Sequence, residues 1–439
     1  MKKAKGCGAA KRSRTQDRDA VKAEGYRDWR FLPELVLDRI SDKLEYPSDY
    51  LSFLLVCKAW NVLAKEEWPH KKRAKYRVPD RLPMIFRHGR VCHLHCIISG
   101  AWVRHFWCFN VLGRCSSKVI GSSFGWLIAY DTHEYGPDRM PPIYVLNLKL
   151  RDMEIFAEVP QSRLCNNVEI FDDLVLDKAI LSADPSKESD YAVAIMCKSK
   201  STSTSKLCVL YKHGPAGGGG VRTSLCPCDE DPILDISCIA GKICWVDRKC
   251  KIRRINQLYP ISEHEFEEAE MESMDPFRGR SKKAFRQYSR TYLVERSNGD
   301  LDPFLVIHEK AKDEETGKVT TVGFRVFILE PKMHPQQEGD GVGSELVWKK
   351  VRSLEDDAMF LSPKAAFCIA PCDSGFQARY IKPEPNCIYY LDAGGNSHSL
   401  EMGIFDVQRG HLRALPQNSA LTSKLNSLRS APIWFSFNT

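Results

Sequence analysis

The sequence predicts a mainly β protein, with a small α-helical module near its N-terminus followed by a multi-bladed β-propeller. Three observations lead to this prediction. From about residue 82 onward, short runs of β-branched, aromatic and Cys residues alternate with Gly, Pro, Asn and Asp, as in strands and turns. Residues 29–68 instead show apolar residues at helical spacing. The β-rich part, at ~350 residues, is too long for a simple sandwich, and a propeller is the economical architecture.

The helical segment shows both a start signal and an apolar stripe. Pro33 suits a first helical turn, where a missing backbone N–H costs nothing. Leu37, Ile40 and Leu44 follow at helical spacing and form one apolar face. Pro47 ends this helix. A second helix with a broader apolar face is predicted from the following residues: Leu51, Leu54, Leu55, Val56 and Leu63.

The β-rich part contains ten apolar runs that we interpret as strand-forming. They are 119–130, 143–148, 191–197, 207–211, 233–246, 292–295, 304–308, 323–329, 387–391 and 403–407. Weak repeats support a propeller, because Gly125 precedes Asp131 by the same interval that separates Gly241 from Asp247. The repeats are too degenerate to give the number of blades.

The charge distribution separates a basic tail from a nearly neutral body. The net charge is +8, and residues 1–18 contain seven Lys or Arg and one Asp. We predict that residues 1–25 are a disordered basic tail, because they contain almost no large apolar side chain. Either the tail is simply solvated, or its basic residues form a nuclear import signal. The candidates for that signal are Lys2, Lys3, Lys5, Lys11, Arg12 and Arg14. The predicted domains are the tail 1–25, the helical module 26–68, a basic linker helix 69–81 and the propeller 82–439.

The composition fits a globular protein of the nucleus or the cytoplasm, or of both. Hydrophobic residues make up 43% and charged residues 27% of the chain. The first residues lack the apolar run of a signal peptide, and no apolar stretch is long enough for a transmembrane helix. The 17 Cys follow no disulfide-framework spacing, so we expect reduced thiols.

The helical module carries a specific motif. Leu32 and Pro33 open an amphipathic helix, and after a short turn Leu51 precedes the segment Val56-Cys57-Lys58-Ala59-Trp60. This pattern resembles the F-box. The resemblance implies that the module binds a Skp-type adaptor, which bridges to a cullin. The residues that match the adaptor-facing or box-packing positions are Leu32, Pro33, Leu37, Ile40, Leu44, Leu51, Val56, Cys57 and Trp60. Leu54 and Asn61 occupy positions that are commonly Arg in the family.

The rest of the chain resembles a large group of plant F-box proteins with a kelch-like propeller. The resemblance is carried by residues 121–127, 235–243, 292–296, 348–354, 357–362, 386–392 and 432–435. It implies a substrate-recognition subunit of an SCF-type cullin ubiquitin ligase, with the adaptor and an unknown target protein as partners. We expect no enzymatic activity of the chain itself, no cofactor, and no nucleic-acid or membrane partner.

Two further motifs are better explained as ordinary strand or loop sequence than as a functional site. The segment Cys92-His93-Leu94-His95-Cys96 invites a zinc site, but no matching second pair follows. Gly217–Gly220 lacks the Lys-Ser/Thr of a phosphate-binding loop. We therefore predict no catalytic residues and no metal ligands. The alternative is a stand-alone propeller, either a scaffold or a small-molecule enzyme, with a vestigial F-box-like hairpin. The target is not predicted, and the charged insertion 263–290 is a candidate contact only because long loops often carry function.

Overall fold

The structure, a computed structural model, describes two compact units of the chain. One unit spans residues 1–75 and the other residues 76–439. The described residues are 32–43, 53, 56–58, 60–62, 83–87, 92–96, 102–105, 117–131, 142–147, 152–156, 174–199, 204–212, 221–226, 232–255, 289–300, 302–331, 346–370, 383–393, 400–415 and 433–436. No helix within these ranges is long and apolar enough to cross a membrane.

The N-terminal unit contains the predicted amphipathic helix, α2 (Glu34–Lys43). The carbonyl of Pro33 accepts hydrogen bonds from the backbone N–H groups of Val36 and Leu37, at 2.9 and 3.1 Å, and so starts the helix. Glu34 places a negative charge in the first turn, where the helix dipole favours it. Further along, residues 53, 58 and 60–62 are helical, but Val56 and Cys57 are not, so the described residues do not form the single second helix that the sequence predicts.

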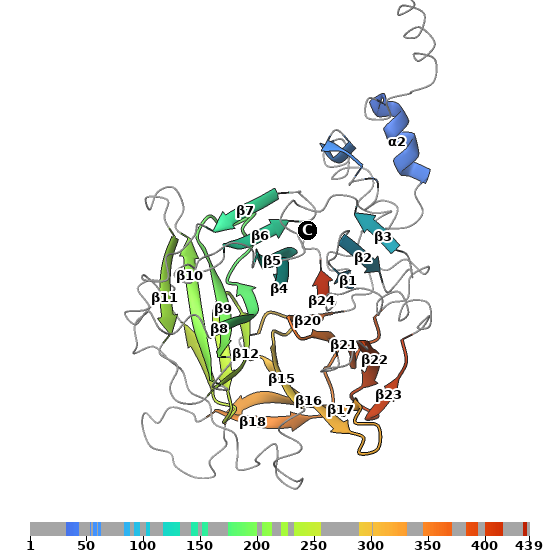
Figure 1. The fold of residues 1–439 in the computed structure, drawn as a ribbon. Coiled ribbons are helices and arrows are strands. Elements are labelled where there is room, and N and C mark those ends of the chain that lie inside the picture. The colour runs from blue at the N-terminus through green and yellow to red at the C-terminus, as the bar shows by residue number, and fades with distance from the viewer. Residues whose placement is uncertain are drawn as a thin grey trace, which may run out of the picture. The chain divides into compact units, whose positions relative to one another are not determined.

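The larger unit is built from six sheets, counted over the described residues (Figure 1). The first sheet contains β24 (Ile433–Ser436), β1 (Pro83–Arg87), β2 (Cys92–Cys96) and β3 (Trp102–His105), in that order. The second contains β4 (Ser117–Ser123), β5 (Trp126–Asp131), β6 (Ile143–Asn147) and β7 (Asp152–Phe156). The third contains β8 (Leu174–Leu181), β9 (Tyr191–Ser199), β10 (Ser205–Lys212) and β11 (Val221–Cys226).

The remaining three sheets follow in chain order. The fourth contains β12 (Ile233–Ile239), β13 (Lys242–Asp247) and β14 (Ile252–Ile255). The fifth contains β15 (Arg290–Val294), β16 (Phe304–Lys312), β17 (Val319–Pro331) and β18 (Leu346–Val351). The sixth has the order β20 (Ala365–Ile369), β19 (Ala358–Ser362), β21 (Cys387–Ala393), β22 (Leu400–Asp406) and β23 (His411–Arg413).

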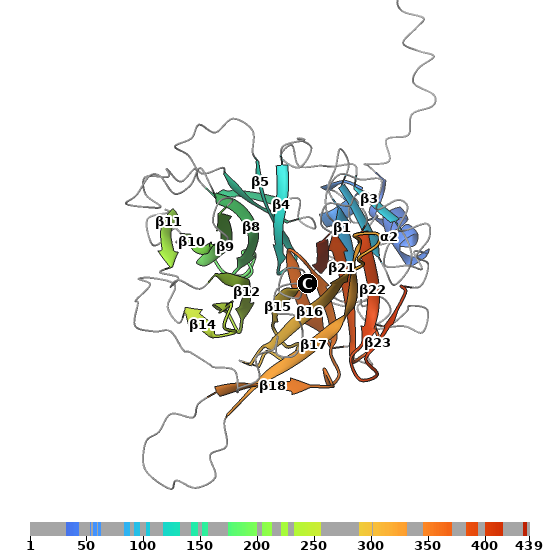
Figure 2. The ribbon, with the colours of Figure 1, turned by 60° about the horizontal axis from the view of Figure 1, so that its bottom comes forward.

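The innermost strands of these sheets meet in a ring. Strand β4 contacts β8, β8 contacts β12, β12 contacts β15, β15 contacts β20, and β20 contacts β24, which returns to β4. Figure 2 shows the sheets standing around this ring in a second view. The C-terminal strand β24 pairs antiparallel with β1, so that the two ends of the β-rich part share one sheet. The arrangement is that of a β-propeller.

The hydrophobic core lies between neighbouring sheets. Strand β9 illustrates this, because Val193 and Ile195 join a cluster with the second sheet, whereas Ala192, Ala194 and Met196 join a cluster with the fourth. Three further clusters connect the fourth sheet to the fifth, the fifth to the sixth, and the sixth to the first. Successive side chains of a strand point to opposite faces, and these clusters cover both faces of the third to sixth sheets. This explains why the strands read as continuous apolar runs.

Two of the predicted runs are hairpins and not single strands. The run 119–130 turns at Phe124 and Gly125, and the run 233–246 turns at Ala240 and Gly241. All four residues have positive φ, between 47° and 79°, which is the conformation of a tight two-residue hairpin turn. Gly125 and Gly241 therefore occupy equivalent turns, and Asp131 and Asp247 end the strands that follow. The weak sequence repeat is thus a structural repeat.

Several predictions lie outside the described residues. They are the basic tail with all six nuclear-import candidates, the linker helix 69–81, the Gly-rich segment 217–220 and most of the insertions 263–290 and 331–345. The segment Cys92–Cys96 is strand β2, which pairs with β1 and β3. Among the described side chains, no group of three or more His, Cys, Asp or Glu is placed to hold a metal ion.

Candidate recognition site at the central cavity

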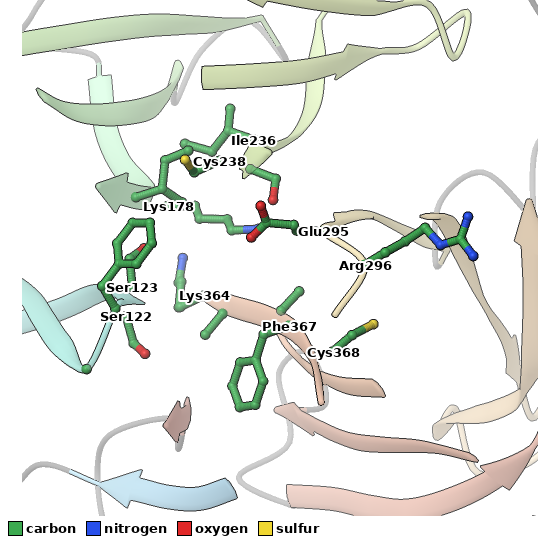
Figure 3. A pocket seen from close by; sticks show the side chains of 16 residues that line it. Ser122, Ser123, Lys178, Ile236, Cys238, Glu295, Arg296, Lys364, Phe367 and Cys368 are labelled. Atoms are coloured by element: carbon green, nitrogen blue, oxygen red, sulfur yellow. The ribbon is translucent and has the colours of Figure 1, made fainter. Parts of the chain in front are cut away.

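A cavity of about 120 Å³ lies at the ring of innermost strands (Figure 3). We call it the central cavity. Five of the six sheets contribute to its lining. The lining residues are Ser122, Ser123, Phe124, Gly125, Lys178, Ile180, Ile236, Ser237, Cys238, Glu295, Arg296, Lys364, Ala365, Ala366, Phe367 and Cys368. In the view of Figure 3, the guanidinium of Arg296 points away from the other labelled side chains.

A β-bulge places two charged residues of β8 next to the cavity. The pairing of β8 with β9 shifts between Leu176 and Lys178, which leaves Asp177 as the extra residue. The inner strands β4 and β12 carry similar shifts, before Gly121 and before Asp235. Gly121 is required here, because a Cβ atom would lie only 1.9 Å from the carbonyl oxygen of Ala179. The inner strands therefore approach closely where the charged residues gather.

The ion pair of Lys178 and Asp235 joins three sheets. The amine of Lys178 donates to Oδ1 of Asp235 at 2.7 Å, and both side chains are at most 5% exposed. The backbone N–H of Leu293 donates to Oδ2 of the same carboxylate at 2.8 Å. Both carboxylate oxygens are thus satisfied, which a buried charge requires. The pair fixes β8, β12 and β15 relative to one another.

Asp177 interacts with two lysines. Lys364, in the turn between β19 and β20, donates to the carboxylate and to the backbone carbonyl of Asp177. Lys198 of β9 lies 2.5 Å from the other carboxylate oxygen. Burial alone would raise the pKa of Asp177, but the two ammonium groups hold it well below its ordinary value. Burial also lowers the pKa of Lys364, against the opposing effect of Asp177.

The two cysteines of the cavity are neutral thiols. Burial raises the pKa of Cys238 and of Cys368 well above the ordinary value for a thiol. The thiol of Cys238 also lies 3.3 Å from the carbonyl oxygen of Ser182, to which it can donate. A protonated thiol is a poor nucleophile, so the geometry suits packing better than covalent chemistry.

The carboxylate of Glu295 is held at the edge of the cavity. Its Oε1 atom accepts a hydrogen bond from the backbone N–H of Ala240, in the β12–β13 turn, at 2.7 Å. Arg296 instead pairs with Glu355 at 2.7 Å and with Asp300 at 3.5 Å, away from the cavity. The cavity therefore presents charged groups already ordered by the protein, which is a property of recognition sites.

The F-box-like residues lie in the N-terminal unit. Leu37 and Trp60 are buried, and the ring of Trp60 lies 4.8 Å from that of Phe53. Leu32, Ile40 and Cys57 are half-buried, whereas Pro33 and Val56 are exposed. Leu44 and Leu51 lie outside the described residues. Their role in adaptor binding stays a prediction.

The sequence analysis did not predict a site at the central cavity, although the segments 121–127, 235–243 and 292–296 that carry the family resemblance contain several of its lining residues. Lys178, Asp235 and Lys364 come from parts of the chain that are 57 or more residues apart, and no spacing connects them. The nearest signal is the pair Asp177-Lys178, two opposite charges inside an otherwise apolar strand. A buried strand rarely contains ionisable residues without partners, so this pair could have indicated a charged site.

The chain shows a family relationship over its β-rich part. The sequence profile of the KIB1-4 beta-propeller family matches residues 105–406, which is more than half of the chain. The matched region runs from the end of β3 to the end of β22 and includes every residue that lines the central cavity. No curated protein matches the chain.

Proposed function

The chain belongs to the KIB1-4 beta-propeller family, and from this premise we propose that it is the substrate-recognition subunit of an SCF-type cullin ubiquitin ligase. A β-propeller domain suits a protein-interaction scaffold, because its loops surround a rigid frame. In the proposal, the N-terminal unit binds a Skp-type adaptor and the propeller binds the target protein.

One observation carries this proposal. The N-terminal unit combines the F-box-like sequence with large apolar side chains that its own fold leaves exposed. Leu35 is 67% exposed, and Val36 and Val56 are 39% and 44% exposed. A module of this size cannot bury all its apolar surface alone, and burial against a partner helix would be favourable.

The proposed mechanism is one of effective concentration. The chain would hold its target close to a ubiquitin-charged conjugating enzyme on the same assembly, so that transfer becomes in effect intramolecular. No residue of this chain would form or break a bond. The neutral thiols and the ion-paired Lys and Asp of the central cavity agree with a binding role.

A stand-alone propeller remains the rival proposal, and the central cavity is the observation that favours it. The cavity gathers ionisable side chains from several sheets, as a small-molecule site would. The two proposals differ in what happens when the N-terminal unit is altered. A ligase receptor depends on that unit, and a propeller that acts alone does not.

The test is size-exclusion chromatography of the purified chain with a purified Skp-type adaptor at micromolar concentration. We expect the two to co-elute, and we expect the variant Leu32→Ala/Pro33→Ala/Trp60→Ala to elute apart from the adaptor. Because Trp60 is buried, a second variant, Leu35→Lys, changes only an exposed side chain. If the folded wild-type chain does not co-elute, the proposal is wrong and the rival gains support.

A further inference from the structure

One ion-paired group beside the central cavity, that of Asp177, contains more lysines than carboxylates. Lys178 pairs with Asp235, and Lys310 pairs with Asp392. Asp177, however, is shared by Lys364 and Lys198. This carboxylate therefore neutralises only one of its two ammonium partners.

Arg290 adds a further cation to the same group. It lies on the innermost strand β15, and the charges of Asp392, Asp177 and Asp235 all act on it. Its positive charge also acts on Lys364. Among the described residues, three cations therefore act on Asp177: Lys198, Lys364 and Arg290.

Arg290 also has an unsatisfied donor. Its Nη1 atom is buried and has no hydrogen-bond partner within the described part of the protein. Leaving a buried, charged donor unpaired costs more than leaving a neutral one unpaired. An anion that accepts hydrogen bonds is favoured both by an excess of ammonium groups and by a cationic donor nearby, although Arg290 itself does not line the central cavity.

The ammonium group of Lys364 can be reached by an anion in the central cavity. Its side chain is 23% exposed and lines the central cavity, whereas that of Lys178 is only 3% exposed. Ser122, Ser123 and Ser237 contribute further polar groups to the lining. The cavity volume of about 120 Å³ exceeds the room that a single water needs. An oxyanion with a few non-hydrogen atoms is of suitable size.

We propose that the central cavity binds a small oxyanion, with Lys364 as its main contact and Asp177 as the carboxylate that competes for that lysine. The oxyanion is either a free ion of the phosphate type or the carboxylate of an acidic side chain on a bound protein. Both present oxygen acceptors to the same cations. The site belongs to the propeller alone, so it does not depend on adaptor binding by the N-terminal unit.

Isothermal titration calorimetry on the full-length chain tests this inference with two probes, inorganic phosphate and N-acetyl-aspartate amide. We expect the wild type to bind at least one of them. Lys364→Met should weaken that binding by about tenfold, the low end for a hydrogen bond to a charged group. Lys364→Arg should restore most of it. The preferred probe then distinguishes a free ion of the phosphate type from an acidic side chain.

Asp177→Asn gives a sharper test, because it removes the carboxylate that pairs with Lys364 and leaves the lysine in place. Loss of the competing carboxylate should tighten binding, whereas damage to the fold would weaken it in both variants. Lys349→Met is the matched control, since Lys349 lies on β18, is 61% exposed and pairs with Glu330. The inference is wrong if neither probe binds the folded wild type. It is also wrong if Lys364→Met and Asp177→Asn shift affinity in the same direction, or if Lys349→Met matches Lys364→Met.

Discussion

The two units of this chain differ in how many large apolar side chains they expose to solvent. In the N-terminal unit, the few described residues include four exposed large apolar side chains: Leu35, Val36, Val56 and Val62. In the much larger propeller, the described residues include two, Val175 and Val322. Scattered single exposed residues are normal, but a concentration in one small module indicates a surface that a partner covers.

The difference follows from how each unit builds its core. The third to sixth propeller sheets are packed on both faces by their neighbours, and the hydrophobic core lies between them. The N-terminal unit buries only Leu37, Phe53 and Trp60 among its described residues. The propeller thus supplies its own stability, and the N-terminal unit is suited to gain stability from a partner. The following predictions test that contrast.

The largest effect on the free energy of unfolding is expected in β24, the C-terminal strand that pairs with β1. Trp434 of β24 is fully buried, and its indole N–H donates to the carbonyl of Leu361 in the sixth sheet at 2.8 Å. Trp434→Ala should lower the free energy of unfolding by about 3–5 kcal/mol, because it leaves a cavity and removes this hydrogen bond. Urea unfolding measures the loss. An unchanged midpoint would show that the ends of the β-rich part do not stabilise one another.

The next largest effect on the free energy of unfolding is expected from breaking a buried ion pair, and breaking an exposed ion pair should have a much smaller effect. Asp235→Ala leaves Lys178 buried without its partner, which should cost about 3 kcal/mol of unfolding free energy. Glu330→Ala removes the partner of the exposed Lys349 and should cost less than about 1 kcal/mol. Thermal unfolding of the two variants side by side measures both. Equal losses would mean that the Lys178–Asp235 pair does not join the sheets.

The sequence predicted the propeller because many short strand-forming runs follow one another over a segment too long for a simple sandwich. It did not separate 119–130 and 233–246 into hairpins, because Phe124 and Ala240 are unusual residues for positive φ. It also did not predict the charge cluster. The partners of Asp177 and Lys178 are distant in sequence, and a one-residue bulge in β8 determines where the two side chains are placed.

The core between the fifth and sixth sheets should make stability depend on pH. His308 is 1% exposed, stacks on Phe324 at 4.4 Å and contacts the hydroxyl of Thr321 at 2.8 Å. Burial, followed by the charge of Lys310, lowers its pKa to about 3. The contribution of neutral His308 is complete above the ordinary value of 6.5 and is lost as pH falls toward about 3, because the unfolded chain binds the proton first.

The titration of His308 can change the free energy of unfolding by at most about 1.4 kcal/mol per pH unit. In His308→Phe, that part of the pH dependence should disappear. Urea unfolding at a series of pH values between 3 and 7 compares the two proteins. Parallel curves would show that the pKa of His308 is the same in the folded and the unfolded chain.

The smallest effect on stability is expected in the N-terminal unit. Leu35→Lys/Val36→Lys changes two exposed side chains of α2 and should shift the unfolding free energy by less than about 0.5 kcal/mol. Circular dichroism during heating checks this. A large loss would mean that these side chains stabilise the chain itself, and the apolar surface would then need no partner.

Adaptor affinity of this double variant is the most direct test of the central claim. Surface-immobilised Skp-type adaptor is titrated with the wild-type chain, with Leu35→Lys/Val36→Lys, and with Val322→Lys, which changes a propeller residue that is 44% exposed. The account predicts micromolar or tighter binding by the wild type and by Val322→Lys, and at least a tenfold loss in the double variant. Equal affinity of all three proteins, or no binding by the folded wild type, would contradict the claim that the N-terminal unit recruits a ligase.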